Sequence, residues 1–514
     1  MARGGEFGDA VRLSQNLART ATDSPGKNCP MDPQPSSAET TRIARRYFLG
    51  ECGVGIGSMA LATLFGTDRL FGAGAVATEE SIINPSAAKP PHYSPRAKHV
   101  IFLFMAGGPS QLELFDFKPE LKKYDGKQVP AEVIEGFDLP FIERDAALMA
   151  SPVKFSRHGE CGAEISEMLP HLGSVADDIA IVKSVHTDAF NHAPAQIFLH
   201  TGHLQFGKPS MGSWITYGLG SDSKDLPAYI VLGQTAVSGG SSCFNCGFLP
   251  TVYQGVPFRS QGAPVLFVEN PPGVDAQLQR DTLDTIRRLN HNRLRAIGDP
   301  EIAARISAYE MSFRLQSSAP ELMDLSRESP QTLAMYGADP AKPSFAGQCL
   351  LARRLVERGV RFVEVSIKGW DHHSNVVDGI RKISHSVDQA CAALVMDLKQ
   401  RGLLDETLII WGGEFGRTPM VENNPALGRS RGRDHHPNAF AMWFAGGGIR
   451  PGVTLGKTDD MGYHVVEDPV HIHDVQATVL HLLGMDHTEL TFQFQGRDFR
   501  LTDVGGEVVD GLVA

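Results

Sequence analysis

Four short clusters of polar residues carry the side chains that could do chemistry in this chain. Each places Asp, His, Glu or Arg beside glycine or proline, in segments too polar for a buried strand. In chain order, they are Asn191-His192-Ala193-Pro194-Ala195-Gln196, Gly369-Trp370-Asp371-His372-His373, Gly413-Glu414-Phe415-Gly416-Arg417 and Gly432-Arg433-Asp434-His435-His436-Pro437. Imidazole together with carboxylate suits a divalent ion such as zinc, manganese or iron. Metal-assisted chemistry is therefore the first expectation.

The triplet Asp-His-His occurs twice, at 371–373 and at 434–436. Either copy alone could be a solvated loop, but the repetition favours two loops that converge on one ion. Alternate residues leaving a strand point the same way, so Asp371 and His373 are preferred to His372. From the second copy, His436 is preferred to His435. The full candidate metal set is Asp371, His373, His436, Glu414, His372 and His435.

Four residues are candidates for the reaction itself: His192, Asn191, Glu414 and Arg417. The segment around His192 resembles a polar turn that opens a helix, and a helix N-terminus is a natural site for an anion. Glu414 could bind metal or exchange protons, and Arg417 could clamp an anionic oxygen. Alternatively, Glu414 and Arg417 form a structural ion pair at a tight turn.

Buried strands are expected directly before most of these clusters. Five apolar runs predict strands at 99–105, 179–185, 360–367, 407–411 and 439–444. Amphipathic segments predict helices at 348–358, 383–401 and 473–483. Strands that alternate with helices indicate an α/β fold with a doubly wound, mostly parallel sheet and helices on both faces. Ligands bind such sheets beyond the carboxyl ends of the strands, where the polar clusters fall.

Composition limits the class of partner. The 514-residue chain has a formal net charge of −11 and no long Lys/Arg run in its main part, so a nucleic-acid partner is not expected. An anionic substrate would need a local positive site such as a metal. The segment 225–343 is expected to be an insertion or a helical and loop cap. Cys243 and Cys246 form a lone C-x-x-C that could be a disulfide or two free thiols.

The first residues are expected to direct export. Arg45-Arg46 precedes a weakly apolar stretch and Ala75-Val76-Ala77, an order typical of a twin-arginine signal with a small-residue cleavage site. The expected divisions are 1–30 as a disordered or wrongly assigned start, 31–77 as signal peptide, 78–96 as linker and 97–514 as the main domain. The mature protein is then expected in the periplasm or at the cell surface, with no stable membrane span.

The order of motifs resembles the alkaline phosphatase and sulfatase superfamily, and within it the exported, sulfatase-like bacterial family called DUF1501. The resemblance covers about Lys98 to the end. Besides the clusters above, it rests on Met105-Ala-Gly-Gly-Pro-Ser110, His473-Asp474-Val475, His481-Leu-Leu-Gly484 and Gly496-Arg-Asp-Phe-Arg500. It implies an alkaline phosphatase-like fold.

The resemblance also assigns roles to positions. His192 falls at the nucleophile position of sulfatases, where it could act as a nucleophile or as a general acid/base. Without Cys or Ser at this position no formylglycine can form, and Gln196 replaces the arginine of the motif. One metal site of the superfamily matches Asp371, a following His and a distant His. The other has lost most of its ligands, because Gly107 or Gly108 stands where an aspartate is usual and Glu414-Phe415 stands where an Asp-His pair is usual. One metal ion is therefore expected rather than two.

These observations lead to two functional hypotheses. The first is an exported hydrolase of phosphate or sulfate esters, acting on an anionic small molecule or glycan with one divalent metal ion such as zinc, manganese or calcium. The alternative is a catalytically inactive protein that keeps the fold and binds an anionic glycan or a partner protein. The changed residues favour the alternative, and the surviving polar clusters favour the enzyme.

Overall fold

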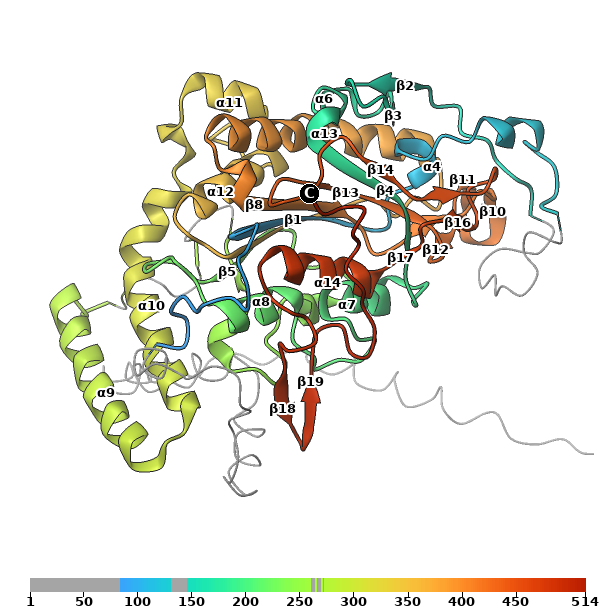
Figure 1. The fold of residues 1–514 in the computed structure, drawn as a ribbon. Coiled ribbons are helices and arrows are strands. Elements are labelled where there is room, and N and C mark those ends of the chain that lie inside the picture. The colour runs from blue at the N-terminus through green and yellow to red at the C-terminus, as the bar shows by residue number, and fades with distance from the viewer. Residues whose placement is uncertain (1–83, 131–145, 260–263, 266–269, 271) are drawn as a thin grey trace, which may run out of the picture. The chain divides into compact units, whose positions relative to one another are not determined.

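The computed structural model describes residues 84–130, 146–259, 264–265, 270 and 272–514. The expected signal peptide, and the linker as far as residue 83, lie outside the described residues. Within them, one central sheet of nine strands organises the main domain (Figure 1). Its strands are β1 (His99–Ala106), β4 (Ile179–His186), β5 (Tyr229–Gly233), β6 (Val256–Pro257), β7 (Phe362–Lys368), β8 (Thr407–Gly412), β13 (Phe440–Ala445), β14 (Thr454–Leu455) and β17 (Val470–His471).

The sheet is mostly parallel. Its order is β14-β4-β13-β8-β1-β7-β5-β6, and β17 also pairs with β4. At the centre, β1 lies between β7 and β8 and is parallel to both. β13 alone runs against its neighbours, because it is antiparallel to β4 and to β8. The five strands expected from apolar runs are all present, within one or two residues of their predicted ends.

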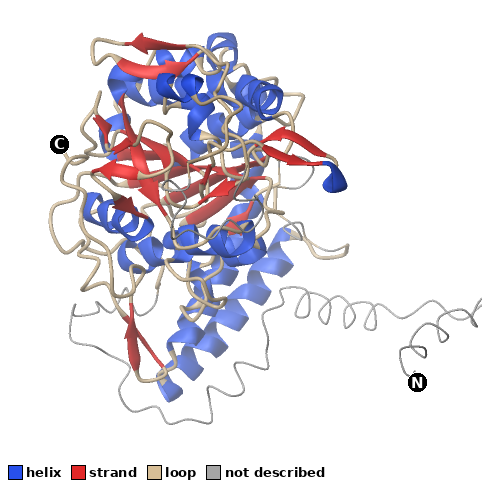
Figure 2. Cartoon of the chain, turned by 90° about the vertical axis from the view of Figure 1, so that its right-hand side faces the viewer, coloured by secondary structure: helices blue, strands red, loops and turns tan. Residues whose placement is uncertain are grey.

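Helices cover both faces of the sheet, as the alternating pattern predicts (Figures 1 and 2). Every residue of β1 is buried, and successive side chains enter opposite layers. Ile101 packs with the helices of one layer, and Phe102 packs with those of the other. The first layer holds α6 (Pro170–Gly173), α12 (Phe345–Val356) and α13 (Val376–Gln400), and the second holds α7 (His192–Thr201), α8 (Met211–Leu219) and α14 (Ile472–Leu482).

The expected insertion at 225–343 is only partly separate from the sheet. β5 and β6 fall inside this range, and β5 pairs with β7 over five residues. The sequence missed β5 because its short apolar run lies beside a Gly/Ser/Pro-rich stretch. The range also contains α9 (Ala276–Ile297), α10 (Pro300–Met323) and α11 (Pro330–Tyr336). α9 and α10 pack against each other as a long helical pair outside the sheet (Figure 1).

Cys243 and Cys246 are buried free thiols, so this pair is not a disulfide in the structure. Among the described helices, none combines the length and the apolar character that crossing a bilayer requires.

Candidate metal centre

The loops after β7 and β8 leave the same edge of the sheet. Asp371 follows β7, Glu414 follows β8, and both strands are parallel neighbours of β1. β13 reaches this edge from the other direction. Because it is antiparallel, the residues that precede it, including His435, lie at the edge where the parallel strands end. The expectation of one shared edge is confirmed.

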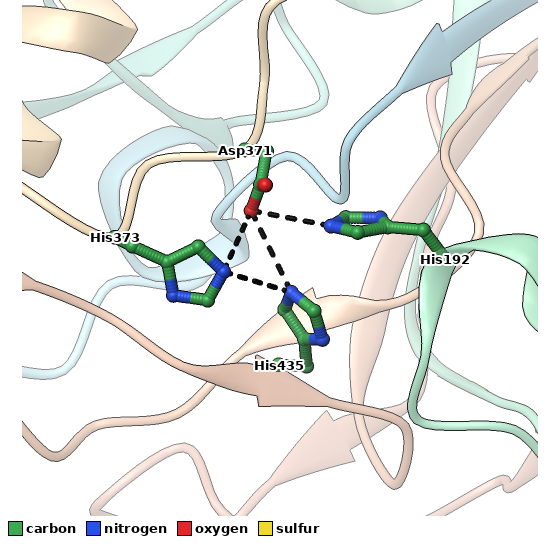
Figure 3. A group of neighbouring side chains, drawn as sticks. All are labelled: His192, Asp371, His373 and His435. Carbon is green, nitrogen blue, oxygen red and sulfur yellow. Dashed lines mark hydrogen bonds and ion pairs between the residues drawn. The ribbon is translucent and has the colours of Figure 1, made fainter. Parts of the chain in front are cut away.

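Four side chains meet at this edge: His192, Asp371, His373 and His435 (Figure 3). Oδ1 of Asp371 lies 3.2 Å from Nε2 of His192, 3.0 Å from Nε2 of His373 and 3.5 Å from Nε2 of His435. Nε2 of His373 and Nε2 of His435 are 3.1 Å apart. Three imidazoles therefore direct the same ring atom toward one carboxylate oxygen.

The other nitrogen of each ring is held by an acceptor. Nδ1 of His192 donates to Glu414 at 2.7 Å, and Nδ1 of His373 donates to Glu422 at 2.5 Å. Nδ1 of His435 donates to the carbonyl oxygen of Phe190 at 2.8 Å. Carboxylate and carbonyl oxygens only accept, so each Nδ1 carries the proton and each neutral ring keeps its lone pair on Nε2.

The pKa values reflect this crowding around Asp371. Burial disfavours its charged form, but hydrogen bonds from His192, His373 and His435 hold the pKa of Asp371 far below its usual range. Burial likewise opposes the charge on His192, yet its bonds to Asp371 and Glu414 raise the pKa of His192 to about 9. Burial and the nearby cations lower the pKa of His435 to about 4. These shifts favour the protonated form of His192 next to the Asp371 carboxylate, whereas His435 stays neutral.

Arg417 is buried beneath the cluster and does not face it as an open anion clamp. Its NH2 group donates to Asp371 at 2.7 Å and also to the carbonyl oxygen of Gly107. Its Nε donates to Gly108 O at 2.9 Å, and its NH1 donates to Arg433 O at 3.1 Å. The expected alternative, a Glu414–Arg417 pair, is also absent, since Arg417 pairs with Asp371. Arg417 therefore holds the carboxylate of Asp371 in position.

Glu414 lies behind His192 and outside the group of four. Its fully buried carboxylate accepts bonds from His192, from Gln196 Nε2 at 2.8 Å and from Gly107 N at 3.0 Å. With these donors around it, Glu414 orients His192 rather than facing an ion. The neighbouring Phe415 supplies no ligand, but its ring packs against His192 and His435 at centroid distances of 5.0 and 4.5 Å.

Gly107 lies at the position where the sequence resemblance leads us to expect an aspartate. Its φ is +121°, in the region that favours glycine, and a Cβ there would lie 2.6 Å from the backbone nitrogen of Asp371. No side chain fits at this point without moving the loop after β7. The sequence expectation of a lost second site thus has a steric basis.

The preference for His436 over His435 is corrected by the structure. Adjacent residues of the short strand β12 (His435–His436) point in opposite directions. His435 points to the cluster. The buried His436 donates from Nε2 to the carbonyl oxygen of Tyr463 at 2.7 Å, and its ring stacks on the ring of Tyr463. Burial lowers the pKa of His436 to about 4.

Two further predicted residues lie next to the cluster rather than in it. The ring of His372 packs against Gly379 of α13, and its Nδ1 is buried. Burial lowers the pKa of His372 to about 4. Asn191 is the N-cap of α7, where its side chain accepts a bond from His192 N at 2.8 Å. It fixes the backbone from which His192 extends.

The sequence did not point to the residues that orient the rings. Glu422 holds His373 and is itself paired with Arg429 at 2.5 Å. Gln196 fixes Glu414 and accepts a bond from Gly239 N at 2.8 Å. Glu422 lies in a polar stretch without a motif, so its position gave no signal. Gln196 lies inside the first polar cluster, where the sequence indicates only that it replaces an arginine.

The donor set fits a divalent transition metal. Three neutral imidazoles and a carboxylate match zinc or manganese better than calcium, which prefers oxygen ligands. Metal-binding histidines usually donate their second ring N–H to a carboxylate or a carbonyl. All three rings do so in this cluster. Nε2 of His192 is buried and faces Oδ1 of Asp371 at 3.2 Å, so it borders the place where the other three side chains would hold an ion.

Several solved structures are similar to this chain at low identity. The PsFucS1 sulfatase from Pseudoalteromonas sp. is 12% identical, with 76% of this chain and 68% of that chain covered and a TM-score of 0.34. The phosphonate monoester hydrolase SpPMH from Silicibacter pomeroyi is 13% identical, with 80% and 78% covered and a TM-score of 0.31. The lipoteichoic acid synthase LtaP from Listeria monocytogenes is 11% identical, with 83% and 80% covered and a TM-score of 0.29.

No curated protein matches the sequence. One family does, and it is described as "Protein of unknown function (DUF1501)". The match runs from residue 97 to residue 513, which takes in every strand of the central sheet and all four residues of the cluster. The chain therefore belongs to the DUF1501 family.

Proposed function

We propose that this protein is a metal-dependent hydrolase of phosphate or sulfate esters. One observation carries the proposal. Each of three imidazoles is held at Nδ1 by an acceptor, so that the three Nε2 atoms converge on Asp371 Oδ1. A hydrogen bond from the second ring nitrogen to a carboxylate or carbonyl oxygen is the usual arrangement for a histidine that binds a metal ion.

Asp371, His373 and His435 would hold the ion. Three protein ligands leave a coordination position open, as catalytic zinc sites do. A bound divalent ion would polarise an ester oxygen and lower the pKa of a bound water. Calcium, one of the ions considered from the sequence, is disfavoured by the imidazole nitrogens.

His192 is the proposed proton carrier. Its Nε2 faces the cluster, while its Nδ1–H remains bound to Glu414, so a proton can move only at Nε2. Protonated His192 would give this proton to the leaving oxygen of the ester. Buried Glu414 stabilises the imidazolium beforehand and limits rotation of the ring. This role is one of the two expected for His192 from the resemblance to sulfatases, the other being that of a nucleophile.

Elemental analysis with ester assays tests the proposal. The purified protein, loaded with zinc or manganese, is expected to bind about one ion per chain and to hydrolyse a p-nitrophenyl phosphate or sulfate ester. Asp371→Ala should lose both the ion and the activity. Asp498→Ala, which removes an exposed carboxylate from the hairpin near the C-terminus, is the matched control. Unchanged metal content in Asp371→Ala would refute the site.

A catalytically inactive binding protein is the second candidate. Its support is that Gly107 leaves no room for a second set of ligands, and that Gln196 replaces the arginine of sulfatases. This candidate predicts a bound metal and binding of an anionic glycan or a partner protein, but no turnover of any ester. Retained metal without hydrolysis would favour it.

We also propose that the protein is exported by the twin-arginine route to the periplasm or the cell surface. Arg45-Arg46 and Ala75-Val76-Ala77 support this proposal. Replacing both arginines by lysine should leave an unprocessed precursor in the cytoplasm. Normal processing of that variant would exclude this route.

A further inference from the structure

The cluster contains many carboxyl groups and few cations. Four carboxyl groups contact it or its imidazoles: Asp371, Glu414, Glu422 and Asp434. Two guanidinium groups face them, Arg417 on Asp371 at 2.7 Å and Arg429 on Glu422 at 2.5 Å. Arg433 adds no charge, because it forms a fully buried pair with Glu113 at 2.8 Å.

A divalent ion would therefore only balance the site. With the four carboxyl groups ionised, the two guanidinium groups and the ion bring the cluster to no net charge when His192 is neutral. With His192 protonated, the cluster has one positive charge. In neither state does it hold the two positive charges that a doubly charged substrate group would require for balance.

Neither Arg417 nor a second metal ion can supply the missing positive charge. The guanidinium of Arg417 is buried, and each of its three nitrogens already donates to the chain. A second metal ion would need a ligand near Gly107, where even a Cβ would lie 2.6 Å from Asp371 N. The net charge of the whole protein, −11, also repels dianions.

We infer that the site selects esters whose acid group carries a single negative charge, namely sulfate monoesters or phosphate diesters, over dianionic phosphate monoesters. The inference rests on the proposed function and narrows its substrate class. Whether His192 is neutral or protonated, a dianion leaves one more uncompensated negative charge next to the buried carboxylates than a monoanion does.

Binding and turnover by the metal-loaded full chain test the inference. At pH 8, calorimetric titration compares phenyl sulfate, diphenyl phosphate and phenyl phosphate, and kcat/KM is measured with the matching p-nitrophenyl esters. At least one monoanion should be favoured over the dianion by about tenfold or more. Comparison of the sulfate ester with the phosphate diester shows which of the two monoanions the protein binds and hydrolyses. The monoester gains a proton below about pH 6, so its affinity relative to phenyl sulfate should rise about tenfold from pH 8 to pH 5.

A charge variant gives an independent test. Asp434→Asn keeps the oxygen that accepts the bond from His435 N at 2.7 Å but removes one negative charge. The ratio of phenyl phosphate to phenyl sulfate affinity should rise several-fold in this variant and stay unchanged in Asp498→Asn. Dianion binding at pH 8 that equals or exceeds monoanion binding would overturn the inference and leave the hydrolase proposal standing. If the metal-loaded protein neither binds nor cleaves any of the esters, both are wrong.

Discussion

Nδ1 of His192 lies 2.7 Å from Oε1 of Glu414, a carboxylate with no exposure to solvent. This contact joins the N-terminus of α7 to the loop after β8, across 222 residues of sequence. It fixes both the tautomer of the ring and the direction of its Nε2 atom. The first prediction concerns this pair.

Replacing Glu414 by Gln should leave the metal in place and slow the reaction. The amide oxygen still accepts the bond from Nδ1, but the charge that stabilises the imidazolium is gone. We expect kcat/KM to fall roughly 10- to 100-fold, as for other groups that orient a site histidine. Elemental analysis should still find about one ion per chain. If metal and activity disappear together, Glu414 is a ligand. Glu467→Gln, a substitution of an exposed carboxylate, is the control and should change neither the metal content nor kcat/KM.

His435 and His436 form a matched pair for the metal assignment. His435→Ala should abolish metal binding, because its Nε2 faces Asp371 and His373. His436→Gln should keep the ion, because its side chain donates to Tyr463 O on the other side of the strand. Metal content after dialysis distinguishes them. The opposite pattern would restore the choice made from the sequence.

Glu422→Gln tests whether the orientation of the His373 ring affects the affinity of the protein for the metal ion. The substitution removes the charge that holds Nδ1 of His373 and also pairs with Arg429. The metal dissociation constant should rise roughly 10- to 100-fold. A competition titration with a metal-binding dye measures it. An unchanged constant would mean that His373 is placed by its backbone alone.

Gly107→Ala should destabilise the protein strongly. The new Cβ would meet the backbone of Asp371 at 2.6 Å, in a conformation that L residues rarely adopt. We expect a loss of about 2–4 kcal/mol in the free energy of unfolding, measured by urea denaturation. Gly207→Ala is the control, because φ there is +84° but nothing lies within 4 Å of its Cβ. Equal losses at the two positions would show that backbone strain, and not the clash, dominates.

Acid should weaken the fold through His436. Its pKa is about 4 in the folded protein because of burial, against an ordinary value of 6.5. The unfolded chain therefore binds the proton first, and stability is lost as the pH falls from about 6.5 toward 4. This residue accounts for about 2–3 kcal/mol of that loss. Urea denaturation at pH 7 and pH 4.5 should show a smaller difference in His436→Gln than in the wild type, and no change in the exposed control His171→Gln.

The sheet was predictable because its strands are apolar along their whole length. A strand such as β1, buried on both faces, leaves an uninterrupted apolar run, and α13 shows the helical period clearly. Asp371 and His373 were found because they directly follow a strand. β5 was missed because a short run beside glycine and proline gives little signal.

The choice between His435 and His436 could not be made from the sequence. It depends on which face of a two-residue strand points to the site, and that is fixed by pairing with Gly416 and Arg417. The role of Arg417 was equally hidden. Its bonds go mostly to backbone carbonyl oxygens of distant segments, which leave no trace in residue types.

The strand order has a consequence for synthesis of the chain. β4 ends at residue 186, yet its partners in the described sheet are β13, β14 and β17, which all begin at or after residue 440. While the ribosome makes the intervening 250 or so residues, β4 can form none of these pairs, and an unpaired apolar strand is prone to aggregate. Completion of the sheet, and with it the arrival of His435, therefore belongs to the last stage of translation, so a nascent chain of this protein needs protection for about half of its synthesis.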